Sequence, residues 1–331
     1  MNVLVTGGAG YIGSHAVRAL LAAGHTPVVL DVLDRGNKQS VPKGVELIVA
    51  DLASVPITKL VSHLSNHNID AVLHFAALAY VGESVHEPIR YYQNNTFGSL
   101  RLLQAMNSAG VNRLVFSSTC ATYGEPDVLP ITEDTPQRPI NPYGRSKLMV
   151  EQIIEDYAAV NPAFAHARLR YFNVAGCSED GSVGEDHRPE THLIPNAILA
   201  ALGKGEPLTI HGNDYDTPDG TCVRDYVHVE DLVDAHLTVM NSLEPGDARI
   251  YNLGTGRGSS VQEIIDAVET ATGEKVPRTV GPRREGDPPT LYADASKIEK
   301  ELGWSPKRTE LADTVASAVR WFREHPDGYG K

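Results

Sequence analysis

A glycine-rich turn near the beginning of the chain constrains the fold more than any other feature of the sequence. Gly7, Gly10 and Gly13 form the pattern Gly-x-x-Gly-x-x-Gly, which follows the apolar run 2–6 and precedes a helical pattern. Glycines at these spacings allow a tight turn, a close approach of the backbone to a pyrophosphate, and tight packing of helix on strand. The positive end of the following helix would then face the phosphates of a dinucleotide.

An acidic residue at the end of the next apolar run strengthens this interpretation. Asp31 is placed where a carboxylate can accept a hydrogen bond from the 2′-hydroxyl of an adenosine ribose. Because the same carboxylate would repel a 2′-phosphate, the sequence predicts NAD rather than NADP as the cofactor. Arg35 could favour NADP, but we interpret it as a solvent-facing loop residue. Asp51, after the third run, belongs either to the adenine edge or to a helix cap.

Short apolar runs alternate with helical patterns through the first half of the chain. Near-continuous apolar runs predict strands buried on both faces at 2–6, 27–31, 45–50, 70–75, 113–117 and 165–170. Helical patterns lie between them at 11–24, 54–68, 88–109 and 143–160. This alternation predicts an α/β fold, namely a Rossmann-type doubly wound parallel sheet with helices on both faces.

The composition changes after about residue 175. Gly, Pro, Asp and Glu gather at 176–190, 203–220 and 281–289, with short helical pieces between them. We therefore expect an NAD-binding Rossmann domain at 1–175 and a smaller, loop-rich C-terminal substrate lobe at 176–331. Some segments of the lobe could return to the main sheet, and the apolar run 249–253 is the candidate strand.

Charge and cysteine content exclude several classes of partner. The 331 residues include 29 basic and 42 acidic side chains, and the net charge of −13 disfavours nucleic acid and anionic membranes. No apolar run approaches the ~20 residues that span a bilayer. The motif at Gly7 leaves no room for a signal peptide, and three widely spaced cysteines suggest neither a disulfide framework nor a metal site. We expect a cytoplasmic protein.

A tyrosine and a lysine four residues apart are the candidate catalytic pair. An Asn-Pro pair before Tyr143 is typical of a helix start, so Tyr143 and Lys147 should project from one helical face. Hydride removal from a secondary alcohol requires a base, and a phenolate can serve if its pKa falls by about 3. A lysine ammonium about 6 Å away supplies on the order of 3 kcal/mol of this, and a positive nicotinamide ring could supply the rest. Thr119, after the fifth run, would complete a Ser/Thr–Tyr–Lys triad.

A series of motifs extends from Met1 to about Trp304. In order, they are TGGAGYIGSH, HFAA, GES, YYQNN, SSTCATYGEP, NPYGRSK, RYFNVAG, HLIP, NDYDTPDGTCVRDYVHV, NLGTG and RREGD. Together they resemble the UDP-glucose 4-epimerase family of the extended short-chain dehydrogenase/reductase superfamily. The resemblance implies NAD-dependent epimerisation at C4 of a UDP-hexose through a 4-keto intermediate, with hydride returned to the opposite face. It also implies a homodimer in which the helices at 88–109 and 143–160 form a four-helix bundle.

The resemblance also implies roles for individual residues. NAD would be bound by the glycine turn and by residues after the strands, namely Gly7, Gly10, Tyr11, Ile12, Gly13, Asp31, Asp51, Leu52, Phe75, Ala76, Ala77, Asn94, Tyr143, Lys147 and Phe172. The UDP-sugar would be bound by Thr119, Asn173, His192, Leu193, Thr209, His211, Arg224, Arg284, Asp287 and Leu291. Within this set, Arg224 and Arg284 would hold the diphosphate as two forks, and 209–211 would lie beside the uracil. No metal ion is implied.

Four positions depart from the bacterial pattern of the family, namely Ala79, Thr119, His192 and Leu291. Thr119 replaces a serine and keeps the hydroxyl group. Leu291 stands where a tyrosine would border the C2 substituent of the sugar. Its intermediate size predicts strong activity on UDP-galactose and weaker activity on UDP-N-acetylgalactosamine, although Leu291 could instead be a packing residue alone.

Other activities and sites remain as alternatives. The same residues could serve a UDP-N-acetylglucosamine or a UDP-pentose (xylose or arabinose) 4-epimerase. A nucleotide-sugar 4,6-dehydratase would need acidic residues after Thr119, where Cys120 and Ala121 stand, and a non-catalytic NAD-binding sensor would lack the Tyr/Lys pair. His63 and His67 have the spacing of metal ligands, but we expect a solvated pair. Cys120 is expected to pack rather than to act as a nucleophile.

Overall fold

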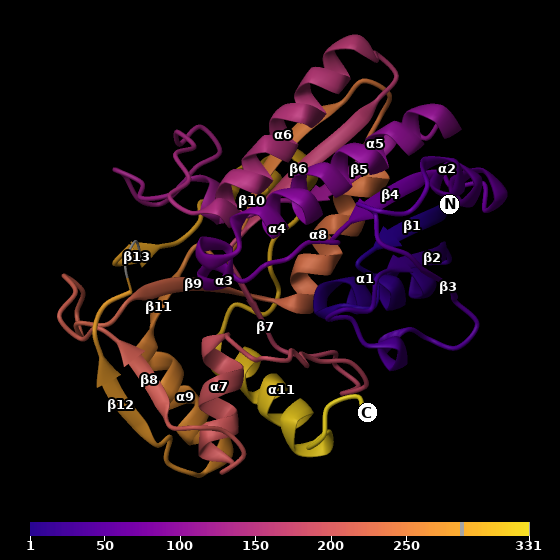
Figure 1. Ribbon diagram of the computed structural model, residues 1–331. Coiled ribbons are helices and arrows are strands. Elements are labelled where there is room, and N and C mark those ends of the chain that lie inside the picture. Colours follow the sequence, from indigo (N-terminus) through magenta and orange to yellow (C-terminus); the bar gives the residue numbers. More distant parts are fainter. Residues whose placement is uncertain (285–287, 331) are drawn as a thin grey trace.

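The computed structural model describes residues 1–284 and 288–330, and a parallel sheet forms its centre (Figure 1). The strands of this sheet are β1 Asn2–Thr6, β2 Thr26–Asp31, β3 Glu46–Val49, β4 Ala71–His74, β5 Arg113–Ser117, β6 Ala165–Tyr171 and β10 Ala248–Leu253. Within the described residues these seven strands lie in the order β10-β6-β5-β4-β1-β2-β3, and all neighbours are parallel. The order reverses at β1, so a ligand crevice is expected at the carboxyl ends of β1 and β4.

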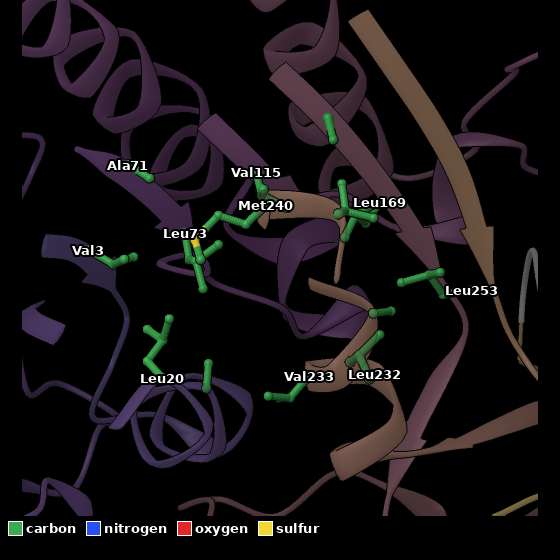
Figure 2. Close-up of a cluster of buried hydrophobic side chains, with 14 of the residues drawn as sticks. Val3, Leu20, Ala71, Leu73, Val115, Leu169, Leu232, Val233, Met240 and Leu253 are labelled. Carbon is green, nitrogen blue, oxygen red and sulfur yellow. The ribbon is translucent and has the colours of Figure 1, made fainter. Parts of the chain in front are cut away.

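Helices cover both faces of the sheet. Those of one face are α1 Tyr11–Ala22 and α8 Val229–Ser242, and those of the other are α2 Ile57–Asn66, α5 Gly98–Ala109 and α6 Pro142–Val160. Figure 2 shows the first interface, where Leu20 and Val233 of the helices lie with Val3 and Leu73 of the strands. The predicted Rossmann-type doubly wound fold is confirmed. Nowhere in the described chain is a helix both long and apolar enough to cross a membrane.

The remaining elements form a smaller lobe, which lies below the sheet in Figure 1. They are β7 Asn173–Ala175, α7 Leu193–Ala201, β8 Leu208–His211, β9 Val223–His228, β11 Gly258–Ser260, α9 Val261–Thr272, β12 Arg278–Gly281, β13 Thr290–Leu291 and α11 Leu311–Glu324. In the described residues, β9 pairs with β7, β11 and β13, while β8 pairs with β12. α7, α9 and α11 share a core that includes Ile198, Ile264 and Val315.

Later segments of the chain also join the core of the first half. The run 249–253 forms β10, which pairs with β6 at the edge of the sheet. α10 (Ser296–Leu302) follows the lobe, and its Ile298 is buried with Trp304 in the same cluster as α1 and α8. The main sheet is therefore completed by residues far along the chain.

The helix expected at 88–109 is more complex than its sequence pattern. It consists of α4 (Pro88–Tyr91), a π-helical turn η2 (Tyr92–Phe97) and α5, and a short helix α3 (Val81–His86) precedes it. π-helical turns are rare and occur often at functional sites. Here the side chain of Asn95 accepts a hydrogen bond from the Leu78 N–H at 2.8 Å and donates to the Leu78 carbonyl at 3.0 Å. The π turn thus fixes the segment that follows β4.

Candidate active site

The turn between β1 and α1 fits a dinucleotide pyrophosphate. Gly7 has a φ of +71°, and a Cβ there would lie 2.7 Å from the Ala76 nitrogen. A Cβ on Gly13 would lie 2.1 Å from the carbonyl oxygen of Gly7, so neither position accepts a side chain. α1 begins at Tyr11, and its N-cap Gly10 has no side chain to cap the first N–H groups. These groups suit a phosphate ligand.

Asp31 ends β2 beside this turn, and backbone N–H groups hold its carboxylate. Oδ2 accepts from the N–H of Ala9 at 3.0 Å, and Oδ1 accepts from the N–H of Leu33 at 2.8 Å. Burial raises the pKa of Asp31, while the two N–H groups act in the opposite direction. Each oxygen keeps a lone pair that can accept from a ribose hydroxyl. The position therefore fits NAD.

Arg35 is not the solvent-facing residue that we expected. Its guanidinium lies 4.1 Å from the centre of the Tyr80 ring, and its Nη2 lies 2.6 Å from Oε1 of Glu83. An aromatic face and a carboxylate on α3 together explain why this side chain is only 20% exposed. Because its charge is already paired, Arg35 gives no support for NADP.

The other residues expected at the cofactor lie where strands of the sheet end. Asp51 and Leu52 follow β3. Phe75, Ala76 and Ala77 follow β4, Asn94 lies in η2, and Phe172 lies between β6 and β7. Carboxyl ends of parallel strands share one edge, so these residues lie toward the same edge of the sheet. The carboxylate of Asp51 accepts from the Ala53 N–H and the Ser54 hydroxyl, both at 2.8 Å. Asp51 thus caps a turn before α2, not α2 itself.

Tyr143, Lys147 and Thr119 meet at the carboxyl end of β5. Tyr143 and Lys147 lie in the first turns of α6, which is capped by the side chain of Asn141. The hydroxyl of Thr119 lies close enough to that of Tyr143 to lower its pKa, and Nζ of Lys147 donates to the carbonyl of Ser117 at 2.8 Å. All three side chains are buried. The structure therefore brings together the three residues expected to be catalytic.

Burial shifts the pKa of both members of the pair toward the neutral form. It raises the pKa of Tyr143 well above the usual 10 and lowers the pKa of Lys147 to about 7. The direction at Tyr143 is opposite to the lowering that we expected, because loss of solvent is the largest influence on the pKa of this hydroxyl. The carboxylate of Glu151 opposes the effect of burial on Lys147. A phenolate at Tyr143 therefore requires positive charge beyond that of the chain itself.

Glu151 is a residue of this region that the sequence analysis missed. Its side chain is 1% exposed, and its Oε2 lies 2.6 Å from Nη2 of Arg170 on β6. The hydroxyl of Ser118 and the amide of Gln137 also donate to it. The signal that could have found it is the spacing of Tyr143, Lys147 and Glu151, since residues four apart share a helical face.

The lobe brings part of the expected sugar site to the catalytic edge. Asn173 begins β7, Arg224 lies on β9 and Leu291 lies on β13, and these strands belong to one small sheet. Leu291 is paired in register with Arg224, and it packs in an apolar cluster with Phe172. Arg224 lies close enough to Cys120 to influence the pKa of its thiol. This sheet therefore adjoins the region of Thr119.

The rest of the expected sugar site is more dispersed. Thr209 and His211 lie on β8, Leu193 begins α7, and Arg284 lies on an exposed segment after β12. Nδ1 of His192 contacts the carboxylates of Glu185 and Glu190, which the sequence analysis did not consider. Asp287 lies outside the described residues.

Two expectations about reactive side chains can be compared with the structure. Burial raises the pKa of the Cys120 thiol to about 12, which agrees with a packed residue rather than a nucleophile. Nδ1 of His67 lies 2.8 Å from the carbonyl oxygen of His63, so a backbone group already engages that ring atom. The centres of the two rings lie 6.4 Å apart, and the expectation of a solvated pair stays a prediction.

A doubly wound sheet, a glycine-rich first turn and a Tyr-x-x-x-Lys pair at the carboxyl edge define a dinucleotide-dependent enzyme of the short-chain dehydrogenase/reductase type. Comparison with known proteins gives the family. Residues 3–254 match the profile of the NAD dependent epimerase/dehydratase family. The chain belongs to this family.

Similar proteins carry names that narrow the activity. The UDP-glucose 4-epimerase of Lactobacillus helveticus is 51% identical, with 99% of each chain covered. UDP-arabinose 4-epimerase 1 of Arabidopsis thaliana is 48% identical over 99% of this chain and 81% of its own. The crystal structure of UDP-glucose 4-epimerase from Bifidobacterium longum in complex with NAD+ and UDP has a TM-score of 0.95 at 41% identity, covering 99% of this chain and 100% of its own.

Proposed function

We propose that this protein is an NAD-dependent UDP-glucose 4-epimerase, which interconverts UDP-glucose and UDP-galactose. The observation that carries the proposal is the meeting of Tyr143, Thr119 and Lys147 beside a turn that fits a dinucleotide. Full-length similarity to UDP-glucose 4-epimerases supports it. The similarity to a UDP-arabinose 4-epimerase keeps pentose substrates as the second candidate.

The roles of the catalytic residues follow from the chemistry at C4. The C4 hydrogen of a pyranose is not acidic, so inversion requires oxidation to a planar 4-ketone and reduction from the opposite face. Tyr143 takes the C4 hydroxyl proton and later returns it, while Thr119 hydrogen-bonds the reacting oxygen. Lys147 contributes its charge to the phenolate. When bound, NAD+ supplies the hydride acceptor and the positive ring charge that this oxidation requires.

The substrate residues must hold the nucleotide while the sugar turns over. Rotation about the diphosphate link presents either face of the ketone, so the nucleotide needs firm contacts and the sugar loose ones. We assign the diphosphate to Arg224 and Arg284, whose planar guanidinium groups suit bidentate contacts. The uracil is assigned to 209–211, and the remaining sugar contacts are assigned to Asn173, His192, Leu193, Asp287 and Leu291.

A coupled assay tests this proposal. Purified protein is given UDP-galactose, UDP-N-acetylgalactosamine and UDP-xylose in parallel, with the Tyr143→Phe variant as control. We expect the native protein to turn over UDP-galactose fastest of the three substrates. The variant should turn over UDP-galactose far more slowly than the native protein does. If UDP-xylose is turned over faster than UDP-galactose, the pentose alternative replaces the proposal.

We also propose a homodimer through a four-helix bundle that α5 and α6 form with their counterparts. The two helical segments pack on each other, and each presents an exposed apolar residue, Phe97 before α5 and Met149 on α6. Light scattering after gel filtration tests this. We expect a dimer for the native chain and a monomer for Phe97→Glu/Met149→Glu, and a native monomer contradicts the proposal.

Two further assignments accompany the function. We propose a Rossmann domain at 1–175 and a substrate lobe at 176–331, with β10 and α10 returning to the first core. We propose a cytoplasmic location because Cys120, Cys177 and Cys222 are free thiols, which suit a reducing compartment. Limited proteolysis and cell fractionation test these two assignments.

A further inference from the structure

Four side chains with metal-binding atoms converge in the segment between β7 and α7. They are Glu185, His187, Glu190 and His192, and one ligand atom from each lies within 4.8 Å of all the others. Two imidazoles and two carboxylates in the order Glu-x-His-x-x-Glu-x-His are a donor set that suits Zn2+. Among the described residues, this is the one group of His, Cys, Asp and Glu side chains found with its ligand atoms this close together.

The separations match the edges of a tetrahedral metal site. Nδ1 of His192 lies 2.8 Å from Oε1 of Glu185 and 2.9 Å from Oε1 of Glu190. Nδ1 of His187 lies 3.0 Å from Oε1 of Glu185 and 3.7 Å from Oε2 of Glu190. A tetrahedral zinc with ligand bonds of about 2.0–2.1 Å places its ligand atoms about 3.3 Å apart. Three of the four distances are shorter than this value by 0.3–0.5 Å and one is longer, so the ligand atoms would move apart only slightly around an ion.

The site is also built to hold positive charge. The side chains of Glu185 and Glu190 are 5% and 9% exposed, and buried carboxylates need a cation. The cation between these carboxylates is therefore either a pair of protons or a metal ion.

Surrounding groups fix the ligands in place. Oε1 of Glu190 accepts from the N–H of Thr191 at 2.7 Å and from the N–H of His192 at 2.8 Å. The Trp321 indole donates to the carbonyl of Glu185 at 2.9 Å. Such outer contacts orient metal ligands and are typical of real metal sites. A cavity of about 160 Å³ borders Glu185, His187 and Glu190.

We propose that these four residues bind one structural Zn2+ ion. Four protein ligands complete the tetrahedral shell of the ion, so the role of the ion is structural rather than catalytic. His192 would bind the ion through Nδ1, which leaves Nε2 for the sugar contact assigned above. The ring of His187 contacts Tyr11 at 6.3 Å and Tyr80 at 6.0 Å between ring centres. Both tyrosines belong to the first half of the chain, so the ion would secure the lobe segment against the cofactor turn.

Metal analysis of the NAD-loaded protein tests the proposal. Protein stripped with a chelator is dialysed against buffered Zn2+, desalted and measured by mass spectrometry of the metal. We expect one Zn2+ per chain for the native protein, and at least ~10-fold weaker binding in His187→Gln and Glu190→Gln. The matched control is His63→Gln/His67→Gln, which removes two histidines at the C-terminal end of α2 and should leave the stoichiometry at one.

Two results would overturn the proposal. One is a zinc content of the native protein no higher than that of the buffer alone. In that case the two histidines are protonated and form ion pairs with the two glutamates. The other is equal zinc retention by the native chain and the His187→Gln variant. The visible spectrum of the native protein with Co2+ gives an independent reading that needs no variant. We expect the intense bands of tetrahedral Co2+, and the weak bands of the octahedral ion contradict the assigned geometry.

Discussion

An ion pair in the cofactor half and an ion pair in the lobe have similar nitrogen–oxygen distances but differ in their exposure to solvent. Glu151 and Arg170 approach to 2.6 Å, and Asp214 and Arg283 approach to 2.7 Å. The side chains of the first pair are 1% and 3% exposed, whereas those of the second are 71% and 47% exposed. The first pair is therefore held by the fold, while water can replace either partner of the second.

This difference extends to the two halves of the proposed active site. The residues that we propose to be catalytic lie on α6 and at the end of β5, where helix and sheet packing fixes them. Arg284, assigned to the diphosphate, lies on an exposed segment of the lobe. Oxidation at C4 needs a fixed geometry, and turning of the sugar needs a more adaptable one. The contrast between the halves is thus what the proposed reaction requires.

The largest expected effect comes from breaking the buried pair. Glu151→Gln leaves Arg170 as a buried cation without its carboxylate, which should lower the free energy of unfolding by about 3–5 kcal/mol. Urea unfolding followed by circular dichroism measures this. The matched control Asp214→Asn should leave the urea midpoint close to the native value. Equal losses of unfolding free energy in the two variants would contradict the difference between the two ion pairs.

Loss of the proposed base has the next largest effect. Tyr143→Phe keeps the ring packing but removes the proton acceptor, so turnover of UDP-galactose should fall at least ~10²-fold. The amount of NAD that copurifies with the protein should hardly change, because the pyrophosphate turn is untouched. Steady-state assays and cofactor quantification measure the two quantities, and near-native turnover contradicts the assigned role.

The choice of cofactor gives a moderate effect. Because the carboxylate of Asp31 would face a 2′-phosphate, the protein should prefer NAD over NADP by at least ~1.4 kcal/mol, or tenfold. Asp31→Asn removes the negative charge and should narrow this preference. The matched control is Asp34→Asn, an exposed carboxylate paired with Arg90. Reconstitution of stripped protein with each dinucleotide measures the ratio, and a preference for NADP contradicts the account.

The smallest effect concerns the range of substrates that Leu291 allows. This side chain is 9% exposed and packs with Phe172 and Tyr123, so a tyrosine there adds bulk to a filled cluster. Overpacking costs about 1–3 kcal/mol, and we expect Leu291→Tyr to reduce turnover of UDP-N-acetylgalactosamine at least ~5-fold more than that of UDP-galactose. Parallel assays measure both. If the two substrates respond equally, Leu291 is a packing residue and not a gate.

Much of the cofactor half could be predicted from the sequence because its signals are local. The glycines, Asp31 and the Tyr143/Lys147 spacing each lie within one strand–turn–helix unit, and β10 was recognisable as an apolar run. The π-helical turn that holds Asn95 was not predictable, because one extra residue in a helical turn barely changes an apolar pattern.

The missed features depend on contacts between distant residues. Glu151 becomes significant only when β6 places Arg170 against it, and Arg35 is paired only because α3 brings Glu83 to it. The pKa of Tyr143 has the opposite shift to our expectation because burial, which a sequence does not reveal, is the largest influence on its hydroxyl. Glu185 and His187 are near in sequence to His192, but folding brings the four ligand atoms together.

Epimerisation in D2O tests the central claim of a redox reaction at a fixed catalytic edge most directly. UDP-galactose is incubated with the purified protein until both epimers are present, and the C4 position of each is examined by NMR. Because the hydrogen leaves and returns as a hydride without meeting solvent, we predict that C4 keeps protium in both UDP-glucose and UDP-galactose. Deuterium at C4 would instead show inversion by deprotonation and would contradict the account.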